Sequence, residues 1–385
     1  MIHCKIYNTI NDVPNSWNEL PNYDLFLKTP FLRALEQSLP SNISAYYLGV
    51  FKEDDLVGVV IIQRVQLYIH DVFRKTSSNI VKHCTKHALS SIVRGNALVV
   101  GNLMHTGQHG LFYLSDKISE AVFLDTVFEG IELICEKIKK EFNKKIRIIA
   151  FKDYFESDSI HHNSSFFKKH NLHKAQVQPN MIFAIPKNWK TQQDYFTNFN
   201  KKYRDRYKSA RKKGNSIVKS ELSLDDIKTH SDTLFMLYEN VSDNARVNSF
   251  KLHKNHLYEL KLNLENTFKV FGYFLNNELI GFFTLMLNGT ELETYFLGYN
   301  QDLQHKHQLY LNMLYDMAIY GIENNFENVV FARTAMEIKS SIGAKPHNMH
   351  IYINHTNSVV SNTIVRLSVK YLNPVRKWDE RNPFK

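Results

Sequence analysis

Acidic and phenolic residues alternate in the run ELETYFLGY, residues 291–299. Residues two apart in a β-strand share a face, so the odd-numbered polar residues are expected on a single face. These residues are Glu291, Glu293, Tyr295 and Tyr299. Carboxylates and phenols can move protons, which makes Glu293 and Tyr299 candidate catalytic residues. Cross-strand polar pairs on a solvent-exposed face are the alternative interpretation.

A second candidate group lies in FARTAMEIKSSIGAKPHNMHIY, residues 331–352. Arg333 follows a β-rich run and precedes an expected helix, at the sheet edge where ligands bind in α/β proteins. Glu337 could accept the proton of an amine, or it could complete a capping box with Thr334. Lys339 could pair with a carboxylate, sulfonate or phosphate of a substrate, or it could be an exposed helical lysine.

The positive charge of the chain is concentrated in one segment. Residues 187–219 hold eleven Lys and Arg against two Asp, while the whole chain has a formal net charge of +10. In a helix, Arg204, Lys208 and Arg211 would share one face, at spacings of four and three. The packed face would consist of Tyr203, Tyr207 and Ala210. Such a stripe suits the phosphates of CoA, an acidic carrier protein, anionic lipid or tRNA, unless it is simply a solvated face.

The elements that must position these residues occur twice along the chain. A β-hairpin is expected from residue 43, with its turn at 52–55, and another over 268–287, with its turn at 276–278. Each is followed by an amphipathic helix and a short strand. We interpret the chain as one α/β unit used twice, offset by about 223 residues. Two unrelated hairpin–helix–strand runs are the alternative.

This order predicts an α+β fold with two domains, 1–180 and 181–385, the second opening on the basic helix near 192–213. Hairpins with helices before and after them favour mixed, mostly antiparallel sheets flanked by helices. The chain has 385 residues, of which 43% are hydrophobic and 13% aromatic, which excludes a disordered, collagen-like or coiled-coil protein. Only 14 Gly argue against a Gly-rich nucleotide-binding scaffold.

Cysteine and histidine usage predicts no metal site and no disulfide framework. The three cysteines are far apart and form no CxxC pair. The histidine pairs at 83 and 87 and at 105 and 109 have no third ligand at a recognisable offset. We expect a cytoplasmic protein, because no signal peptide or membrane-spanning run is evident. The basic stretch 64–94 would suit peripheral contact with the inner face of an anionic membrane, although a plain surface helix also explains it.

Three segments resemble the GNAT acyltransferase superfamily, in its tandem-domain branch that includes the FemAB-like peptidoglycan transferases. YFTNFNKKYRDRYKSARKKGN (195–215) resembles the helix that opens the second domain of that family. Residues 331–352 and VRGNALVVGNLMHTGQHGLFY (93–113) are similar to segments of tandem GNAT proteins from bacteria that make unusual aminolipids. The resemblance implies two tandem GNAT-like domains. It also implies that Glu293 is a base acting through water and that Tyr299 reprotonates the leaving thiolate.

One segment departs from the family pattern. GNAT enzymes usually hold the CoA pyrophosphate on a Gly-rich turn at a helix N-terminus. The equivalent turn here, GYNQDLQHKHQLYLN (298–312), has no glycine after Gly298. The expected co-substrate is therefore an acyl-CoA held by other groups or an acyl carrier protein thioester, and no permanently bound cofactor is expected.

The resemblance implies an N-acyltransferase that moves an acyl group from a thioester to an amine. No Ser-His-Asp or Cys-His signature appears, so no covalent enzyme intermediate is expected. The aminolipid resemblance implies a membrane-associated acceptor such as a sphingoid-like long-chain amine. One alternative is FemAB-like transfer from aminoacyl-tRNA to a peptidoglycan precursor. The other is a non-enzymatic protein that binds polyanions, although nucleic acid is not the expected partner.

Overall fold

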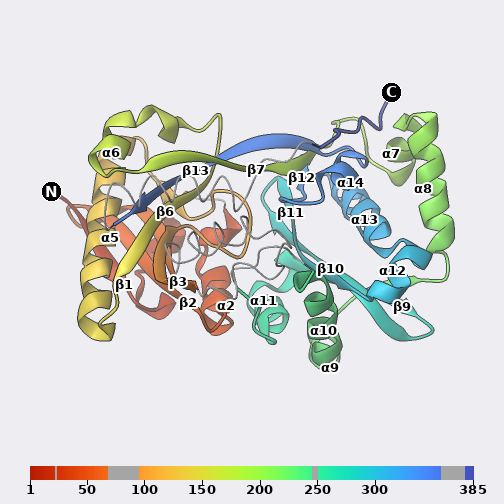
Figure 1. Cartoon of the computed structure of the whole chain (residues 1–385), viewed down its shortest axis with the longest axis horizontal. Helices are drawn as coiled ribbons and strands as arrows, with labels where there is room; N and C mark the ends of the chain where they lie inside the picture. The colour runs from red at the N-terminus through yellow and green to blue at the C-terminus, as the bar shows by residue number, and fades with distance from the viewer. Residues whose placement is uncertain (22–23, 68–94, 245–249, 357–377) are drawn as a thin grey trace, which may run out of the picture. The chain divides into compact units, whose positions relative to one another are not determined.

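The computed structural model of the chain describes residues 1–21, 24–67, 95–244, 250–356 and 378–385 (Figure 1). The chain forms two compact units. Unit 1 consists of Met1–Gln178, Arg246–His253 and Asn348–Val375. Unit 2 consists of Pro179–Ala245, Lys254–His347 and Arg376–Lys385. The units are therefore not two continuous halves divided at residue 180, because segments late in the chain belong to unit 1.

Unit 1 is built on a mixed sheet. Its strands, in spatial order, are β1 (Ile2–Tyr7), β2 (Ile43–Lys52), β3 (Asp55–Leu67), β4 (Gly95–Val100), β6 (Ile146–Phe155) and the last part of β13 (Lys345–His355). The short strand β5 (Leu111–Tyr113) also pairs with β3. Neighbouring strands are antiparallel except for β4 and β6, which are parallel. The hairpin expected from residue 43 is thus confirmed as β2 and β3.

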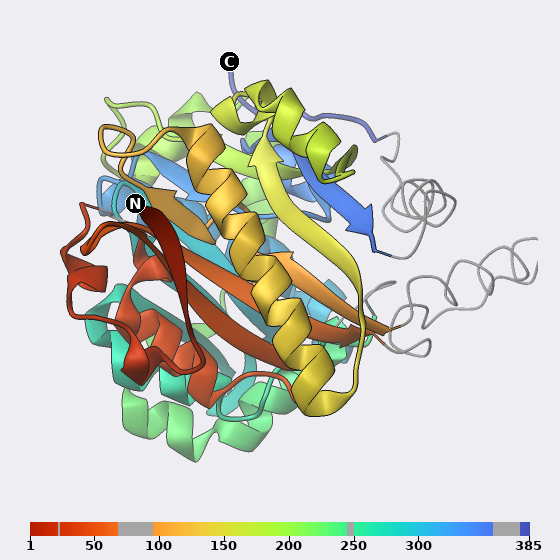
Figure 2. The ribbon, with the colours of Figure 1, turned by 90° about the vertical axis from the view of Figure 1, so that its left-hand side faces the viewer.

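The long helix α5 (Glu120–Phe142) covers one face of this sheet (Figure 2). Ser119 caps its first turn by accepting a hydrogen bond from Val122 N, and left-handed Asn143 ends it. Its apolar residues recur every three or four positions, so they form one buried stripe. That stripe consists of Phe123, Val127, Ile131, Ile134 and Ile138. The amphipathic helix expected after the first hairpin is thus confirmed, although Phe142, which continues the same spacing in its last turn, is 51% exposed.

The other helices in the described part of unit 1 are short. They are α1 (Ser16–Glu19), α2 (Thr29–Gln37) and α6 (Ser164–Lys169), with 3-10 turns at Ile10–Asp12, Leu25–Leu27 and Ser159–His162. Two predictions fall outside the described residues. They concern the histidine pair at 83 and 87 and nearly all of the basic stretch 64–94.

Unit 2 also has a mixed, mostly antiparallel sheet. In spatial order its strands are the last part of β7 (His173–Ala184), β12 (Asn328–Val330), β11 (Glu291–Tyr299), β10 (Glu278–Asn288), β9 (Phe268–Leu275) and β8 (Val218–Glu221). Only β11 and β12 are parallel. The expected hairpin is β9 and β10, and its turn residues Asn276 and Asn277 both have positive φ, as a tight two-residue hairpin turn requires.

Eight helices surround this sheet in the described part of unit 2. They are α7 (Gln192–Asn198), α8 (Lys201–Lys213), α9 (Leu224–Thr229), α10 (Ser231–Ser242), α11 (His256–Leu264), α12 (Gln301–His307), α13 (Leu309–Glu323) and α14 (Met336–Ser340), with a 3-10 turn at Glu265–Thr267. The prediction of a single basic helix near 192–213 is wrong, because this segment forms two helices, α7 and α8. Phe199 is extended, and Asn200 starts a new helix by accepting a hydrogen bond from Tyr203 N.

Helix α10 lies directly against strand β11 at Gly298. A Cβ atom added to Gly298 would come within 2.4 Å of the backbone carbon of Leu237 and 2.5 Å of Tyr238 N. Because these are backbone atoms of a helix, neither can rotate away. The close approach of α10 to the sheet therefore depends on the missing side chain.

Replacing Gly298 with Ala is expected to lower the free energy of unfolding by about 2–3 kcal/mol, because helix and strand must separate. Urea denaturation measures this. The control is Gly289→Ala, at a turn where no atom lies within 4 Å of the added Cβ but φ is +60°. Gly289→Ala should lower the free energy of unfolding by only about 1 kcal/mol, because the added side chain strains the backbone at this φ angle. Equal losses in the two variants would contradict the packing argument.

Candidate active site

Strands β11 and β12 pair over a short distance and then separate. The parallel pairing covers Glu291–Glu293 on β11 and Asn328–Val330 on β12. Strand β11 continues to Tyr299, while the chain after Val330 leaves the strand. Among the described strands, β11 beyond Glu293 is thus paired only with β10. Glu293 lies at the point of separation and is 7% exposed.

A β-bulge interrupts the pairing of β10 with β11. The pair Phe283–Leu297 is followed by the pair Leu285–Thr294, so β11 has one residue more than β10 in this stretch. An extra residue bends the strand and reverses which face the following side chains occupy. The strict alternation that the sequence analysis assumed for residues 291–299 therefore does not hold across the bulge.

The bulge places the two strand candidates on opposite faces. Tyr299 packs against the hydrophobic core that includes α13, and a Cβ at its pairing partner Gly281 would meet Met313 of that helix. Glu293 is paired with Met286, on the face that α10 covers. The prediction that Glu293 and Tyr299 share a face is wrong. Burial also raises the pKa of Tyr299.

The chain leaves β12 through a strained turn. Ala332, Thr334 and Ala335 have φ angles of 57°, 68° and 46°, in the left-handed region that residues with a side chain seldom occupy. Lys339 stabilises this turn, since its Nζ lies within hydrogen-bond distance of three backbone carbonyl oxygens. The acceptors are those of Phe331, Ala332 and Arg333. Lys339 is 5% exposed, so the interpretation of an exposed helical lysine is wrong.

The other two candidates of this segment differ in exposure. Burial lowers the pKa of Arg333 to about 10. The Glu337 side chain is 56% exposed and lies 3.9 Å from Arg381 Nη2. Helix α14 begins at Met336 after Ala335, with no side-chain cap, so the capping box of Thr334 and Glu337 is wrong. The structure brings Arg333 and Lys339 together and leaves Glu337 at the surface.

The buried Lys339 predicts a dependence of stability on pH. Burial lowers its pKa from 10.5 to about 7. Between these values the unfolded chain binds the proton and the folded chain releases it, so the free energy of unfolding should rise with pH. The slope should approach about 1.4 kcal/mol per pH unit. Urea denaturation of wild type and Lys339→Met between pH 7 and 9 measures it. Equal slopes in both proteins would contradict the assignment.

In the basic helix α8, two of the predicted binding residues, Arg204 and Arg211, contact other parts of the fold. As predicted, Tyr203, Tyr207 and Ala210 are buried. Arg211 Nη1 lies 2.8 Å from Asp316 Oδ1 of α13, and its guanidinium lies over the rings of Tyr207 and Tyr315. Burial opposes the charge of Arg211, but Asp316 raises its pKa. Arg211 is therefore neutralised within the fold.

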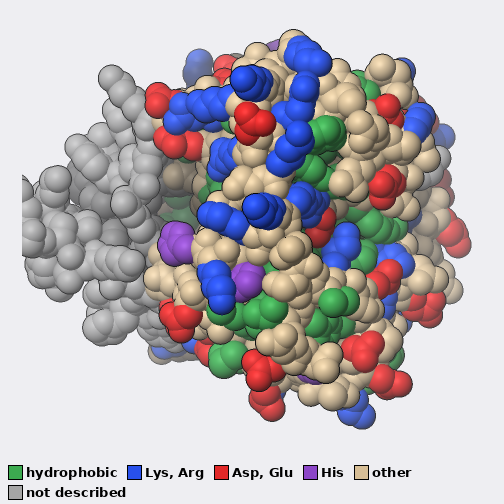
Figure 3. All heavy atoms as spheres, turned by 90° about the vertical axis from the view of Figure 1, so that its right-hand side faces the viewer, with side chains coloured by type: hydrophobic (Ala, Val, Ile, Leu, Met, Phe, Trp, Pro, Cys, Tyr) green, Lys and Arg blue, Asp and Glu red, His purple; other side chains and the backbone are tan. Residues whose placement is uncertain are grey.

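Arg204 and Lys208 both lie over the ring of Phe196 from α7. Arg204 Nη2 also donates to the carbonyl oxygens of Thr197 and Phe199, so it ties α8 to the end of α7. Lysines are the cations of α8 exposed to solvent, and Figure 3 shows basic side chains gathered on this face of the molecule. They are Lys201, Lys202, Lys208, Lys212 and Lys213. A polyanion would thus meet mainly lysines rather than the predicted stripe.

The turn after β11 has its own hydrogen-bond partners. Asn300 accepts from Asp302 N at the start of α12, and Gln304 accepts from Tyr310 N at the start of α13. Two backbone donors that could bind a phosphate are thus already used by side chains. This agrees with the absence of a Gly-rich turn in the sequence.

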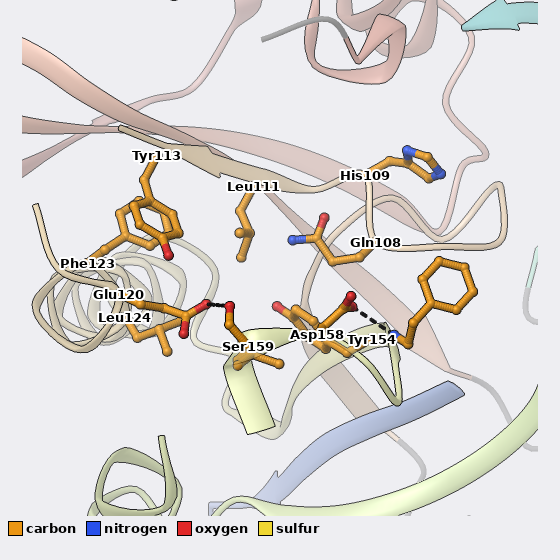
Figure 4. Close-up of a pocket in the computed structure, with 12 residues that line it drawn as sticks. Gln108, His109, Leu111, Tyr113, Glu120, Phe123, Leu124, Tyr154, Asp158 and Ser159 are labelled. Carbon is orange, nitrogen blue, oxygen red and sulfur yellow. Dashed lines mark hydrogen bonds between the residues drawn. The ribbon is translucent and has the colours of Figure 1, made fainter. Parts of the chain in front are cut away.

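A cavity of about 300 Å³ lies within unit 1 and was missed by the sequence analysis (Figure 4). Glu120, at the start of α5, and Asp158, after β6, both line it. Aromatic and aliphatic side chains form much of the remaining wall, including Tyr113 and Phe123, whose rings stack at 4.7 Å. The residues come from separate elements without a shared motif, so no spacing in the sequence indicated them.

The loop that contains the histidine pair at 105 and 109 forms part of the cavity wall, because Gln108 and His109 line the cavity. His109 Nδ1 lies 2.7 Å from Asp24 Oδ2, and the His105 ring stacks on Phe26. Lys152, which pairs with buried Asp153, donates to the carbonyl oxygens of His105 and Gly107. In the described parts of the chain, no group of three or more His, Cys, Asp or Glu is placed to hold a metal.

Comparison with known proteins identifies the fold. No protein-family model and no curated protein sequence matches the chain. The crystal structure of FemX is similar over 94% of this chain and 99% of its own, with a TM-score of 0.55 and 11% identity. A tandem GNAT protein from the clavulanic acid biosynthesis pathway is similar over 93% of this chain and 99% of its own, with a TM-score of 0.50 and 8% identity.

The chain therefore has the tandem GNAT fold of the FemAB-like type, which confirms the predicted α+β class and the resemblance at the level of fold. Sequence identities of 8% and 11% carry the likeness no further than the fold. No helix within the described ranges has the length and apolar character needed to cross a membrane.

Proposed function

We propose that this protein is an N-acyltransferase and that unit 2 carries the transfer. The observation that supports this most is the separation of β11 from β12 at Glu293. Beyond that point β11 offers backbone N–H and C=O groups on the side where β12 has ended. An extended chain with amide groups, such as the pantetheine arm of a thioester donor, can pair with such groups as a strand would.

In the proposed reaction the amine nitrogen attacks the thioester carbonyl carbon, and the C–S bond breaks as the C–N bond forms. Glu293 accepts the proton that the amine loses, directly or through a water molecule. The sulfur leaves as a thiolate and is protonated to the free thiol. The turn held by Lys339 and containing Arg333 follows β12, so it borders the strand where the separation begins.

The donor is proposed to be an acyl-CoA or an acyl carrier protein thioester. The side chains that occupy the backbone donors after β11 argue against the usual pyrophosphate turn. The exposed lysines of α8 are suited to phosphates or to an acidic carrier protein. The acceptor is proposed to be a long-chain amine, on the resemblance of residues 331–352, with the protein at the cytoplasmic surface of a membrane.

A second function is favoured by the lysines of α8 together with the likeness to FemX. It is the transfer of an amino acid from aminoacyl-tRNA, in which the lysines would contact the tRNA backbone. The chemistry at the carbonyl is the same, except that an ester rather than a thioester is broken.

One assay separates these functions. Purified full-length protein is given acetyl-CoA, a long-chain acyl-CoA, an acyl carrier protein thioester or charged tRNA, each with a panel of short and long amines. Free thiol or deacylated tRNA is followed. The proposal expects thiol release that depends on both thioester and amine. Turnover with charged tRNA alone would support the second function, and no turnover with any donor would favour a polyanion-binding protein.

A further inference from the structure

The cavity of unit 1 is a negatively charged compartment in a positively charged protein. The whole chain has a formal net charge of +10, yet the side chains that line the cavity include Glu120 and Asp158 and no Lys or Arg. The cavity has room for about ten water-sized groups, given a volume of about 300 Å³. It is thus large enough for a small organic molecule.

The carboxylate of Glu120 is positioned by neutral donors. Ser159 Oγ donates to Glu120 Oε1 at 2.8 Å (Figure 4). Asn163 Nδ2 donates to Glu120 Oε2 at 2.7 Å. Burial, followed by the negative charge of nearby Glu120, raises the pKa of the Tyr113 hydroxyl. These groups orient both oxygens without neutralising the negative charge. The charge therefore remains available to a cationic ligand.

Asp158 is held in a similar way. Its Oδ2 accepts a hydrogen bond from Phe155 N at 2.8 Å. The adjacent His161 is engaged on both sides, since Nδ1 lies 2.6 Å from Tyr352 OH and Nε2 lies 2.8 Å from the carbonyl oxygen of Phe155. Burial, and to a smaller degree the charge of Glu120, raises the pKa of Asp158.

The rest of the wall suits the organic part of such a ligand. The stacked rings of Tyr113 and Phe123 can interact with a cation, and Leu111, Leu124 and Ile160 offer aliphatic surface. A metal ion is a poor match, because it needs several free oxygen ligands and Glu120 already accepts hydrogen bonds on both oxygens. Two carboxylates beside aromatic and aliphatic walls favour an ammonium group with a short alkyl chain.

We propose that the cavity between α5 and the end of β6 binds a small alkylammonium compound, with Glu120 and Asp158 as its charged contacts. The site is formed entirely within unit 1. It does not depend on acyl transfer in unit 2, so either proposal can fail without the other.

Isothermal titration of the full-length protein with n-butylamine, 1-butanol and butyrate tests the proposal. These probes share a chain length and differ in charge. At pH 7.5 and low salt we expect n-butylamine to bind at a single site and to lose affinity as salt screens the charges. The alcohol and the acid should not bind. Equal binding of 1-butanol and n-butylamine, or no binding of n-butylamine, would overturn the proposal.

Variants locate the binding. Glu120→Gln and Asp158→Asn should each weaken n-butylamine binding by about tenfold or more, because one charge-assisted contact is lost. Glu136→Gln, the same change at an exposed position of α5, should leave the affinity unchanged. Circular dichroism checks that each variant folds. If Glu120→Gln does not fold, Asp158→Asn alone tests the assignment. Wild-type affinity in both folded variants would overturn the assignment, as would an equal loss in the control.

Discussion

Replacing Glu293 with Gln is expected to slow acyl transfer by about 10²–10⁴-fold, the usual contribution of a positioned general base. The side chain keeps its size and can still form hydrogen bonds, but the amide cannot take up the proton of the attacking amine. The loss should appear in kcat, with KM for the thioester little changed, because the donor is proposed to bind along the backbone of β11. Steady-state kinetics with the best donor and amine from the panel measures both constants.

The matched control is Glu278→Gln, the same substitution at an exposed position of the β9–β10 hairpin. It should retain the wild-type kcat. The pH profile gives a second readout, since the loss of rate at low pH that reports the base should disappear in Glu293→Gln. A Glu293 variant within threefold of the wild-type rate would remove the base from the proposed reaction and leave the fold assignment unaffected.

The largest loss of stability is expected from Asp316→Ala. Asp316 accepts hydrogen bonds from Arg211, at 2.8 Å, and from the Tyr273 hydroxyl, while Lys219 lies 3.7 Å away. Without this carboxylate, the largely buried guanidinium of Arg211 keeps its charge and loses its partner. Breaking one side of a buried ion pair costs about 3–5 kcal/mol. Urea denaturation near pH 7 should show that decrease in the free energy of unfolding.

A double variant separates charge from packing in this network. Arg211→Met combined with Asp316→Leu removes both charges and keeps apolar volume, so it should recover most of the stability that Asp316→Ala loses. Asp302→Ala, at an exposed position of α12, should change stability by no more than about 0.5 kcal/mol. If the double variant is as unstable as Asp316→Ala, the loss arises from packing rather than from the unpaired charge.

The repeated architecture was predictable because it rests on local patterns. The hairpin turn at Asn276 and Asn277 needs left-handed residues, and asparagine tolerates that conformation. The buried stripe of α5 follows directly from apolar residues spaced by three and four. It could not be predicted from the sequence that late segments of the chain belong to unit 1. Strand pairing between distant segments leaves no periodic pattern in the sequence.

The arrangement of the candidate site was harder to predict. One extra residue in β11 turned Tyr299 away from Glu293, and β-bulges leave little trace in hydrophobic patterning. Lys339 and Arg211 have the residue types of binding groups, yet the fold uses one to hold a strained turn and the other to pair with Asp316. Whether a cation faces solvent or a distant carboxylate depends on tertiary packing that one sequence does not reveal.

Because a late segment of the chain belongs to unit 1, this unit can be completed only late in synthesis. Residues Met349–His355 of β13 pair with β6, although nearly 200 residues separate the two strands in the chain. A ribosome must therefore add at least 355 residues before β6 acquires this neighbour. Until then the nascent chain keeps an unpaired strand edge, the kind of surface that promotes aggregation. Domains usually fold as they emerge, N-terminal first, but here the first unit to be translated cannot complete its sheet before most of the second has been made.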